Sequence, residues 1–159
     1  MAAIGTAALA SAPVSATSTE TVSVLLATDS DALFDEVDAA LAGPELVVKR
    51  VRHGVDVRGA VGSERPDLVI LDLQIGNMGG MAVSLDLRME ARADRLDEVA
   101  ILMLLDREAD VFLAKRAEAD GWMVKPIDAF RLRRAAEAIL TGAEWREGSG
   151  AEKPAFINE

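Results

Sequence analysis

The chain has 159 residues, a net charge of −10 at pH 7 and no cysteine, and 50% of its residues are hydrophobic. This length and apolar content suit one domain with a complete core. The acidic balance argues against a nucleic-acid surface, which needs a basic face to displace counterions. The absence of cysteine excludes a disulfide framework and fits a cytoplasmic protein. No apolar stretch approaches the roughly 18 residues of a membrane span, so we expect no membrane insertion.

The two ends of the chain differ in composition from its middle. Residues 1–21 are mainly Ala, Ser and Thr, without the basic and sustained apolar regions of a secretory signal. We therefore predict a disordered N-terminal tail over 1–21. A Gly-Ser-Gly sequence at 148–150 breaks the last helical pattern, which predicts a flexible C-terminal tail over 147–159. The folded domain is expected at 22–146.

Strand-like and helix-like segments alternate between these tails. The first is the apolar run Val22–Ala27, which is typical of a buried strand. Ser30 or Asp31 then caps a helix that runs to Leu41 and stops before Gly43 and Pro44. The same patterns predict the remaining elements, which are strands at 45–51, 68–73, 99–105 and 122–124 and helices at 55–61, 81–93, 107–119 and 128–145.

Five strand–helix repeats of this length predict an α/β fold, with a doubly wound five-stranded parallel sheet and helices on both faces. The strand at 99–105 is apolar throughout, as a central strand buried on both faces should be. In a parallel sheet all carboxyl ends meet at one edge, where open α/β sheets bind their ligands.

Two charged residues stand at the carboxyl ends of predicted strands. Asp72 ends the run that begins at Leu68, and Lys125 follows Val124 and precedes Pro126. If the two strands lie in one parallel sheet, the carboxylate and the ammonium meet at the same edge. An aspartate can act there as a nucleophile toward a phosphoryl donor, and a lysine can compensate the charge of the phosphoryl group.

This alternation, with Asp72 after the third strand and Lys125-Pro126 after the fifth, resembles the receiver domain of two-component response regulators. The resemblance covers about residues 22–145 and implies a CheY-like, flavodoxin-like fold with strand order 2-1-3-4-5. It also implies that Asp72 is the phosphoacceptor and that Lys125 pairs with the phosphoryl group.

The family's Mg²⁺ ligands are only partly matched. An acidic pair after the first strand binds the ion in receivers, and Thr28 and Asp29 stand at these positions. Asp29, Asp72 and the backbone carbonyl of Gln74 therefore remain as metal ligands, with water in the other positions. We expect Mg²⁺ binding that is weakened by Thr28 but still possible.

The family's switch is degraded in this chain. Receivers carry Ser or Thr at the end of the fourth strand, where the hydroxyl bonds the phosphoryl group. The usual spacing from Lys125 places Met103 there, and a loop two residues shorter places Leu105 there; neither has a hydroxyl. Asp106 adds a negative charge nearby. Such a hydrogen bond contributes about 1.5–3 kcal/mol of the roughly 5.5 kcal/mol that a full switch needs, so we expect weak coupling to shape.

Trp122 stands where the family has its switch aromatic, and it is either ordinary core or part of a partner surface. In receivers the partner surface includes the fourth and fifth helices. The other residues expected on this surface are Phe112, Arg131, Arg133 and Arg134.

Two functions suit these residues, and neither is enzymatic. The first is an atypical stand-alone receiver, without a DNA-binding or enzymatic module after it, in which Asp72 accepts phosphate from a histidine kinase. The second is a constitutive adaptor or accessory subunit of a larger protein complex on the cytoplasmic side of a membrane. The chain resembles receivers that are extra subunits of large assemblies, including respiratory NADH dehydrogenase. A flavin or nucleotide enzyme is set aside, because no phosphate loop ends in Gly-Lys-Ser/Thr.

Overall fold

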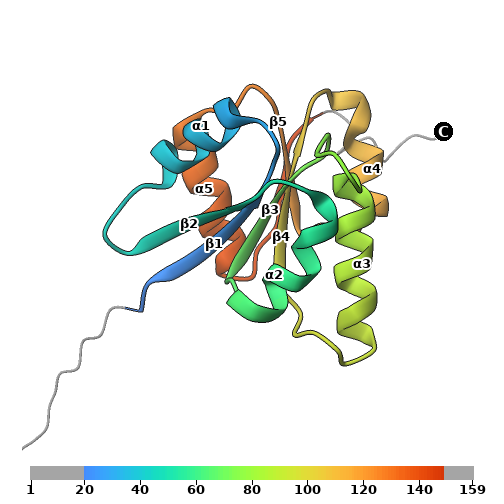
Figure 1. The fold of residues 1–159 in the computed structure, drawn as a ribbon. Coiled ribbons are helices and arrows are strands. Elements are labelled where there is room, and N and C mark those ends of the chain that lie inside the picture. Colours follow the sequence, from blue (N-terminus) through green and yellow to red (C-terminus); the bar gives the residue numbers. More distant parts are fainter. Residues whose placement is uncertain (1–19, 149–159) are drawn as a thin grey trace, which may run out of the picture.

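Strand–helix repeats build one sheet with helices on both faces (Figure 1). The structure, a computed structural model, describes residues 20–148, so the predicted tails lie almost entirely outside the described residues. The strands are β1 (Val22–Ala27), β2 (Leu46–Val51), β3 (Leu68–Asp72), β4 (Ala100–Leu105), β5 (Gly121–Val124) and β6 (Trp145–Arg146). The helices are α1 (Asp31–Leu41), α2 (Val57–Glu64), α3 (Gly80–Arg92), α4 (Val111–Arg116) and α5 (Ala129–Leu140), with short 3-10 turns η2 (Gly54–Asp56) and η3 (Glu108–Asp110).

The sheet has the order β2-β1-β3-β4-β5-β6, and every neighbouring pair is parallel. The predicted α/β class and the order of the first five strands are confirmed. Asp72 lies opposite Leu104, and Val124 lies opposite Leu105. The carboxyl ends of β1, β3, β4 and β5 therefore meet at one edge of the sheet.

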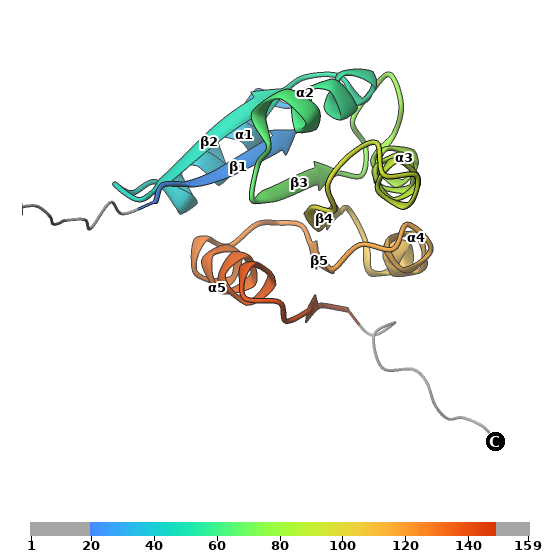
Figure 2. The ribbon, with the colours of Figure 1, turned by 90° about the horizontal axis from the view of Figure 1, so that it is seen from below.

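The core has two layers, one on each face of the sheet. One cluster lies under α2, α3 and α4, and the other lies under α1 and α5, as Figure 2 shows in the view from below. Along β4, Ile101 and Met103 face the first cluster, whereas Leu102 and Leu104 face the second. This alternation follows from the period of two in a strand, and it explains why β4 is apolar throughout.

The first helix begins as predicted. The Ser30 side chain accepts a hydrogen bond from the Leu33 N–H at 3.1 Å, so Ser30 rather than Asp31 is the N-cap. The second helix differs from its predicted bounds, because it begins at Val57 and continues through Gly62 to Glu64. The predicted helix at 107–119 is shorter in the structure, where the turn η3 precedes α4.

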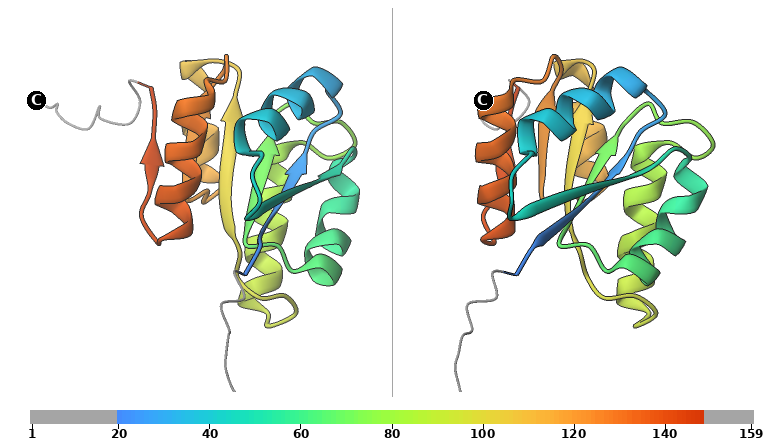
Figure 3. Two further views of the ribbon diagram at one scale, coloured as in Figure 1. Left: turned by 90° about the vertical axis from the view of Figure 1, so that its left-hand side faces the viewer. Right: turned by 60° about the vertical axis from the view of Figure 1, so that its left-hand side comes forward.

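The prediction of one helix over 128–145 was wrong at its end. Helix α5 stops at Leu140, and Gly142 has a φ of +91°, which a glycine adopts without strain. The chain then turns back, and β6 pairs with β5 at the edge of the sheet (Figure 3). A side chain at Gly121 would lie 2.7 Å from the carbonyl oxygen of Trp145, so the glycine allows this close approach.

Glu147 anchors the segment that follows β6. Its carboxylate accepts hydrogen bonds from the Val124 N–H at 3.1 Å and from the Trp145 indole at 3.0 Å. Its backbone carbonyl accepts one from the Trp122 indole at 3.0 Å, and the Arg146 guanidinium lies over the Trp122 ring. Trp122 is therefore a core residue covered by this segment, with 3% of its surface exposed. A partner surface that includes Phe112, which is exposed, stays a prediction.

Candidate functional site

Polar side chains gather at the carboxyl edge of the sheet. They follow or end four different strands, and the parallel order brings these strand ends to one edge. The residues are Thr28 and Asp29 after β1, Asp72 at the end of β3, Asp106 after β4 and Lys125 after β5. Thr28 and Asp72 are buried.

Both carboxylate oxygens of Asp72 accept hydrogen bonds. Its Oδ1 accepts from Lys125 Nζ at 2.8 Å and from the Gln74 N–H at 3.1 Å. Its Oδ2 accepts from the Thr28 hydroxyl at 2.7 Å. The structure thus brings Asp72 and Lys125 together, as their strand positions predicted, and adds Thr28 as a donor. A buried carboxylate is stable only with such partners.

Lys125 contacts two carboxylates. Its Nζ lies 2.8 Å from Asp72 Oδ1 and 2.9 Å from Asp106 Oδ1. Burial alone would lower the pKa of the Lys125 ammonium, but the hydrogen bonds to Asp72 and Asp106 outweigh burial and hold this pKa above its ordinary value. Lys125 therefore carries its positive charge at neutral pH.

Asp29 points toward the loop that follows β3. Its Oδ2 accepts a hydrogen bond from the Gly76 N–H at 3.1 Å. Gln74, two residues earlier, donates its N–H to Asp72. The two predicted acidic ligands therefore contact the same short loop, at residues 74 and 76. Within residues 20–148, no group of three or more acidic, histidine or cysteine side chains is placed to hold a metal ion.

The loop after β3 accepts hydrogen bonds from the segment that precedes α2. The Gly54 N–H donates to the Gly76 carbonyl at 3.0 Å, and the Val55 N–H donates to the Asn77 carbonyl at 3.0 Å. A side chain at Gly54 would lie 1.8 Å from the Met78 carbonyl oxygen, so only glycine fits there. The segment before α2 was not predicted to contribute to the site. Its glycine, Gly54, is the feature of the sequence that could have indicated this contribution.

The two residues considered for the missing hydroxyl lie at different positions along β4. Leu105 ends the strand, and its carbonyl accepts a hydrogen bond from the Lys125 N–H at 2.8 Å. Met103 lies two residues earlier and is fully buried in the core under α3 and α4. Leu105 is therefore the residue of the two at the carboxyl edge, and which of them matches the family's Ser or Thr stays a prediction.

Sequence reasoning missed Arg50 on β2. Its Nε donates to the Thr28 carbonyl at 3.0 Å, its Nη1 donates to Asp31 at 2.7 Å, and its guanidinium lies over the Phe34 ring. Hydrogen bonding from Arg50, together with the charge of Arg52, holds the pKa of Asp31 below its ordinary value. A buried guanidinium thus supports the loop that carries Thr28. The position of Arg50 near the end of β2, beside the end of β1, is the signal that could have indicated it.

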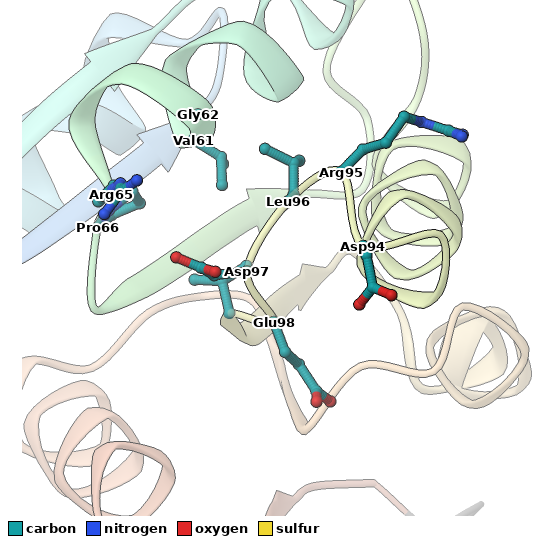
Figure 4. Close-up of a pocket in the computed structure, with 10 residues that line it drawn as sticks. Val61, Gly62, Arg65, Pro66, Asp94, Arg95, Leu96, Asp97 and Glu98 are labelled. Atoms are coloured by element: carbon teal, nitrogen blue, oxygen red, sulfur yellow. The ribbon is translucent and has the colours of Figure 1, made fainter.

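A hollow lies at the opposite edge of the sheet. It is formed between the end of α2 and the loop before β4, and Figure 4 shows Leu96 and Asp97 among its lining residues. The amino ends of the strands lie here, whereas Asp72 and Lys125 lie at the carboxyl ends. This hollow is therefore separate from the candidate site.

Comparison with known proteins agrees with the geometry of this edge. Residues 24–137 match the family model of the response regulator receiver domain. Protein PilH of Pseudomonas aeruginosa is 26% identical over 119 residues, which are 75% of this chain and 98% of PilH. Transcriptional regulatory protein AfsQ1 of Streptomyces coelicolor is 28% identical over 124 residues, and the match spans only 52% of AfsQ1.

A solved structure shows the same fold. Chemotaxis response regulator CheY4 of Vibrio cholerae superposes with a TM-score of 0.65 at 23% identity, covering 75% of this chain and 98% of CheY4. The family match extends from β1 into α5 and includes Asp72 and Lys125, whereas β6 lies beyond it.

Proposed function

The chain belongs to the response regulator receiver domain family, and on that premise we propose that Asp72 accepts a phosphoryl group from a histidine kinase. Receiver domains of this family work in two-component signalling and interact with histidine kinases and other proteins. The observation that carries the proposal is the contact of 2.8 Å between Lys125 Nζ and Asp72 Oδ1 at the carboxyl edge of the sheet. Such a pair supplies a nucleophile and a compensating charge in one place.

The transfer itself requires one oxygen of Asp72. That oxygen attacks the phosphorus of a phosphohistidine, an O–P bond forms, and the P–N bond breaks with its electron pair on the imidazole nitrogen, which then takes up a proton. The Asp72 carboxylate is held from both sides by Lys125 and Thr28, so the attacking oxygen gives up a hydrogen bond. Lys125 then compensates the charge of the acyl phosphate.

The proposal includes a weak Mg²⁺ site, as receiver domains typically bind this ion at the phosphorylation site. The donor set suits the ion, because Asp29 and Asp72 supply carboxylates beside the Gln74 carbonyl, and Mg²⁺ prefers oxygen ligands. The contacts of both carboxylates with residues 74 and 76 support this grouping. When bound, the ion neutralises charge on the incoming phosphoryl group. Thr28 supplies a hydroxyl at the position where the other acid of the family's pair after β1 would strengthen the metal site.

In this proposal the receiver has a weak switch. Leu105 ends β4 without a hydroxyl, so a phosphoryl group at Asp72 finds no side-chain donor there. The hydrogen bond that is missing would contribute about 1.5–3 kcal/mol to holding the following loop. Phosphorylation therefore changes the shape of this domain less than it does in a receiver with Ser or Thr.

A second candidate function is a constitutive adaptor or accessory subunit of a larger complex, such as respiratory NADH dehydrogenase. The observation that favours it is the satisfied state of the site, since Thr28, Lys125 and Gln74 already bind both oxygens of Asp72. Either function acts through protein–protein contact and not through an enzymatic reaction. Within residues 20–148 no helix has the length and apolar character needed to cross a membrane.

The test is the intact mass of the purified chain after incubation with Mg²⁺ and a small-molecule phosphodonor. We expect a gain of one phosphoryl group that the Asp72→Asn variant lacks, because the amide is no nucleophile. An ordinary receiver labelled in parallel controls for the activity of the donor. No gain under these conditions would reject phosphorylation of the wild-type chain and favour the adaptor.

A further inference from the structure

Asp106 forms an ion pair inside the candidate site. Its Oδ1 lies 2.9 Å from Lys125 Nζ, almost as close as Asp72 at 2.8 Å. Asp106 is the first residue after β4, so it stands next to Leu105 at the carboxyl edge. Its neighbour Arg107 is directed elsewhere and pairs with Asp110 at 2.8 Å. Two carboxylates therefore share the ammonium of Lys125.

We propose that Asp106 is a built-in counter-ion of Lys125 that opposes phosphorylation of Asp72. This inference rests on the proposed function and adds a means of regulating the same site. Asp106 acts in two ways, because it occupies a donor of Lys125 and because it places a negative charge beside the incoming phosphoryl group. It is a positioning residue that works through Lys125.

The charge at the site explains the opposition. At rest, one ammonium faces the carboxylates of Asp72 and Asp106, so a negative charge already remains. An acyl phosphate replaces one carboxylate by a group that carries a charge on the order of −1.5 to −2. Asp106 then lies beside this group, and like charges at such distances disfavour the ionised form.

The low solvent exposure of the site strengthens the competition between Asp106 and the phosphoryl group for Lys125. The Asp72 carboxylate is 4% exposed and Lys125 is 24% exposed, so solvent screens their interactions only in part. Asp106 is 37% exposed, so the greater part of its side chain is also shielded from solvent. With a neutral side chain at position 106, the Lys125 ammonium would no longer be shared with a second carboxylate and would interact with Asp72 and the phosphoryl group.

The test compares rates of phosphodonor labelling, followed by intact mass, for the wild-type chain and Asp106 variants. We expect Asp106→Asn to label at least about tenfold faster, because a like charge within about 4–6 Å alters the stability of an ionised group by this much. Asp106→Glu keeps the charge and is expected to label as slowly as wild type. A merely structural role would change the rate in both variants.

Two further variants serve as controls for this comparison. Asp97→Asn removes the same charge at the opposite edge of the sheet, beside the hollow in Figure 4, and is expected to label at the wild-type rate. Asp106→Ser is a second neutral variant in case the amide disturbs folding, which circular dichroism monitors.

The outcomes separate this inference from the proposed function. Labelling of Asp106→Asn with no labelling of wild type would support the inference and show that wild-type Asp72 is held silent. Equal rates in Asp106→Asn and wild type would overturn the inference and leave Asp72 as the phosphoacceptor. No labelling of any variant, with an ordinary receiver labelled in parallel, would overturn both.

Discussion

At the scale of a single residue, Thr28 holds the carboxylate at the centre of the candidate site. Its buried hydroxyl donates to Asp72 Oδ2 at 2.7 Å and accepts from the Ser30 N–H at 3.0 Å. A hydrogen bond to a charged group contributes about 1.5–3 kcal/mol. Thr28 therefore holds the Asp72 carboxylate without a metal ion, whereas an acid at this position would repel Asp72 until an ion bound.

The substitution Thr28→Asp should make the stability of the chain depend on Mg²⁺. A carboxylate beside Asp72 repels it in EDTA and becomes a ligand when the ion is present. We expect a lower Tm than wild type in EDTA and a larger gain in millimolar Mg²⁺, by about 2–4 °C for each kcal/mol of binding. Thermal unfolding followed by circular dichroism measures both.

Thr28→Val is the matched control for this experiment. It removes the hydroxyl without adding charge, so it should lose about 1–3 kcal/mol of stability and show no larger response to Mg²⁺. The same Mg²⁺ response in Thr28→Asp and wild type would count against Asp29 and Asp72 as metal ligands.

At the scale of elements, β6 and the segment after it change the edge of the sheet. Glu147 joins this segment to the neighbouring elements, since its carboxylate binds the Val124 N–H on β5 and lies 3.3 Å from Arg131 on α5. Val124 directly precedes Lys125, so the segment is one residue from the site. It also covers Trp122, which the family's partner surface would expose.

Replacing Glu147 by Ala should loosen this edge. The Val124 amide and the Trp145 indole lose the carboxylate that accepts their hydrogen bonds, whereas the Trp122 indole keeps its acceptor, the backbone carbonyl of residue 147. We expect hydrogen exchange of the Val124 amide to quicken about tenfold, which corresponds to about 1.4 kcal/mol of local stability. Exchange followed by NMR or mass spectrometry, together with a red shift of tryptophan fluorescence, would show the change.

Glu144→Ala is the matched control, because the Glu144 carboxylate forms an ion pair with the exposed Arg146. It should leave the Val124 amide protected. Unchanged exchange in Glu147→Ala would mean that β6 holds the edge without its glutamate.

At the scale of the whole molecule, Lys125 connects three parts of the sheet. It follows β5 and binds both the end of β3 and the loop after β4. Core clusters cover both faces of these strands. Loss of the lysine charge would leave Asp72 buried without a cationic partner, so it should affect global unfolding and not one loop alone.

The free energy of unfolding should therefore fall at alkaline pH. The folded state holds the pKa of Lys125 above its unfolded value, so this stabilisation is complete below the unfolded value and is lost as pH rises through the folded one. The chain has no tyrosine and no cysteine to obscure this range. Denaturant unfolding between about pH 9 and pH 12 measures the fall.

Lys125→Met gives the comparison for this pH dependence. Its free energy of unfolding at pH 7 should be about 1–3 kcal/mol below that of wild type. This difference in free energy should become smaller as pH rises and the wild-type lysine deprotonates. Lys49→Met removes a surface lysine paired with Glu64 and should run parallel to wild type. A constant difference between Lys125→Met and wild type across this range would refute the role of the charge.

The order of the first five strands was implied by the resemblance to receiver domains. The sequence by itself determined the fold class and the meeting of Asp72 with Lys125. These follow from local patterns, such as the Ser30 cap and the apolar run of β4, and from the rule that parallel strands end at one edge. Each of these predictions depends on residues that are close in the chain, or on strand ends that a parallel sheet brings to one edge.

Only the tertiary structure decided the contacts that join distant parts of the chain. Helix α5 could have continued to Trp145 by pattern alone, but Gly142 turns the chain and Gly121 admits β6 beside β5. The pairings of Arg50 with the Thr28 carbonyl and of Asp106 with Lys125 likewise required coordinates. A charged side chain near a strand end has several possible partners, and which one it binds depends on register and side-chain direction, which local periodicity does not encode.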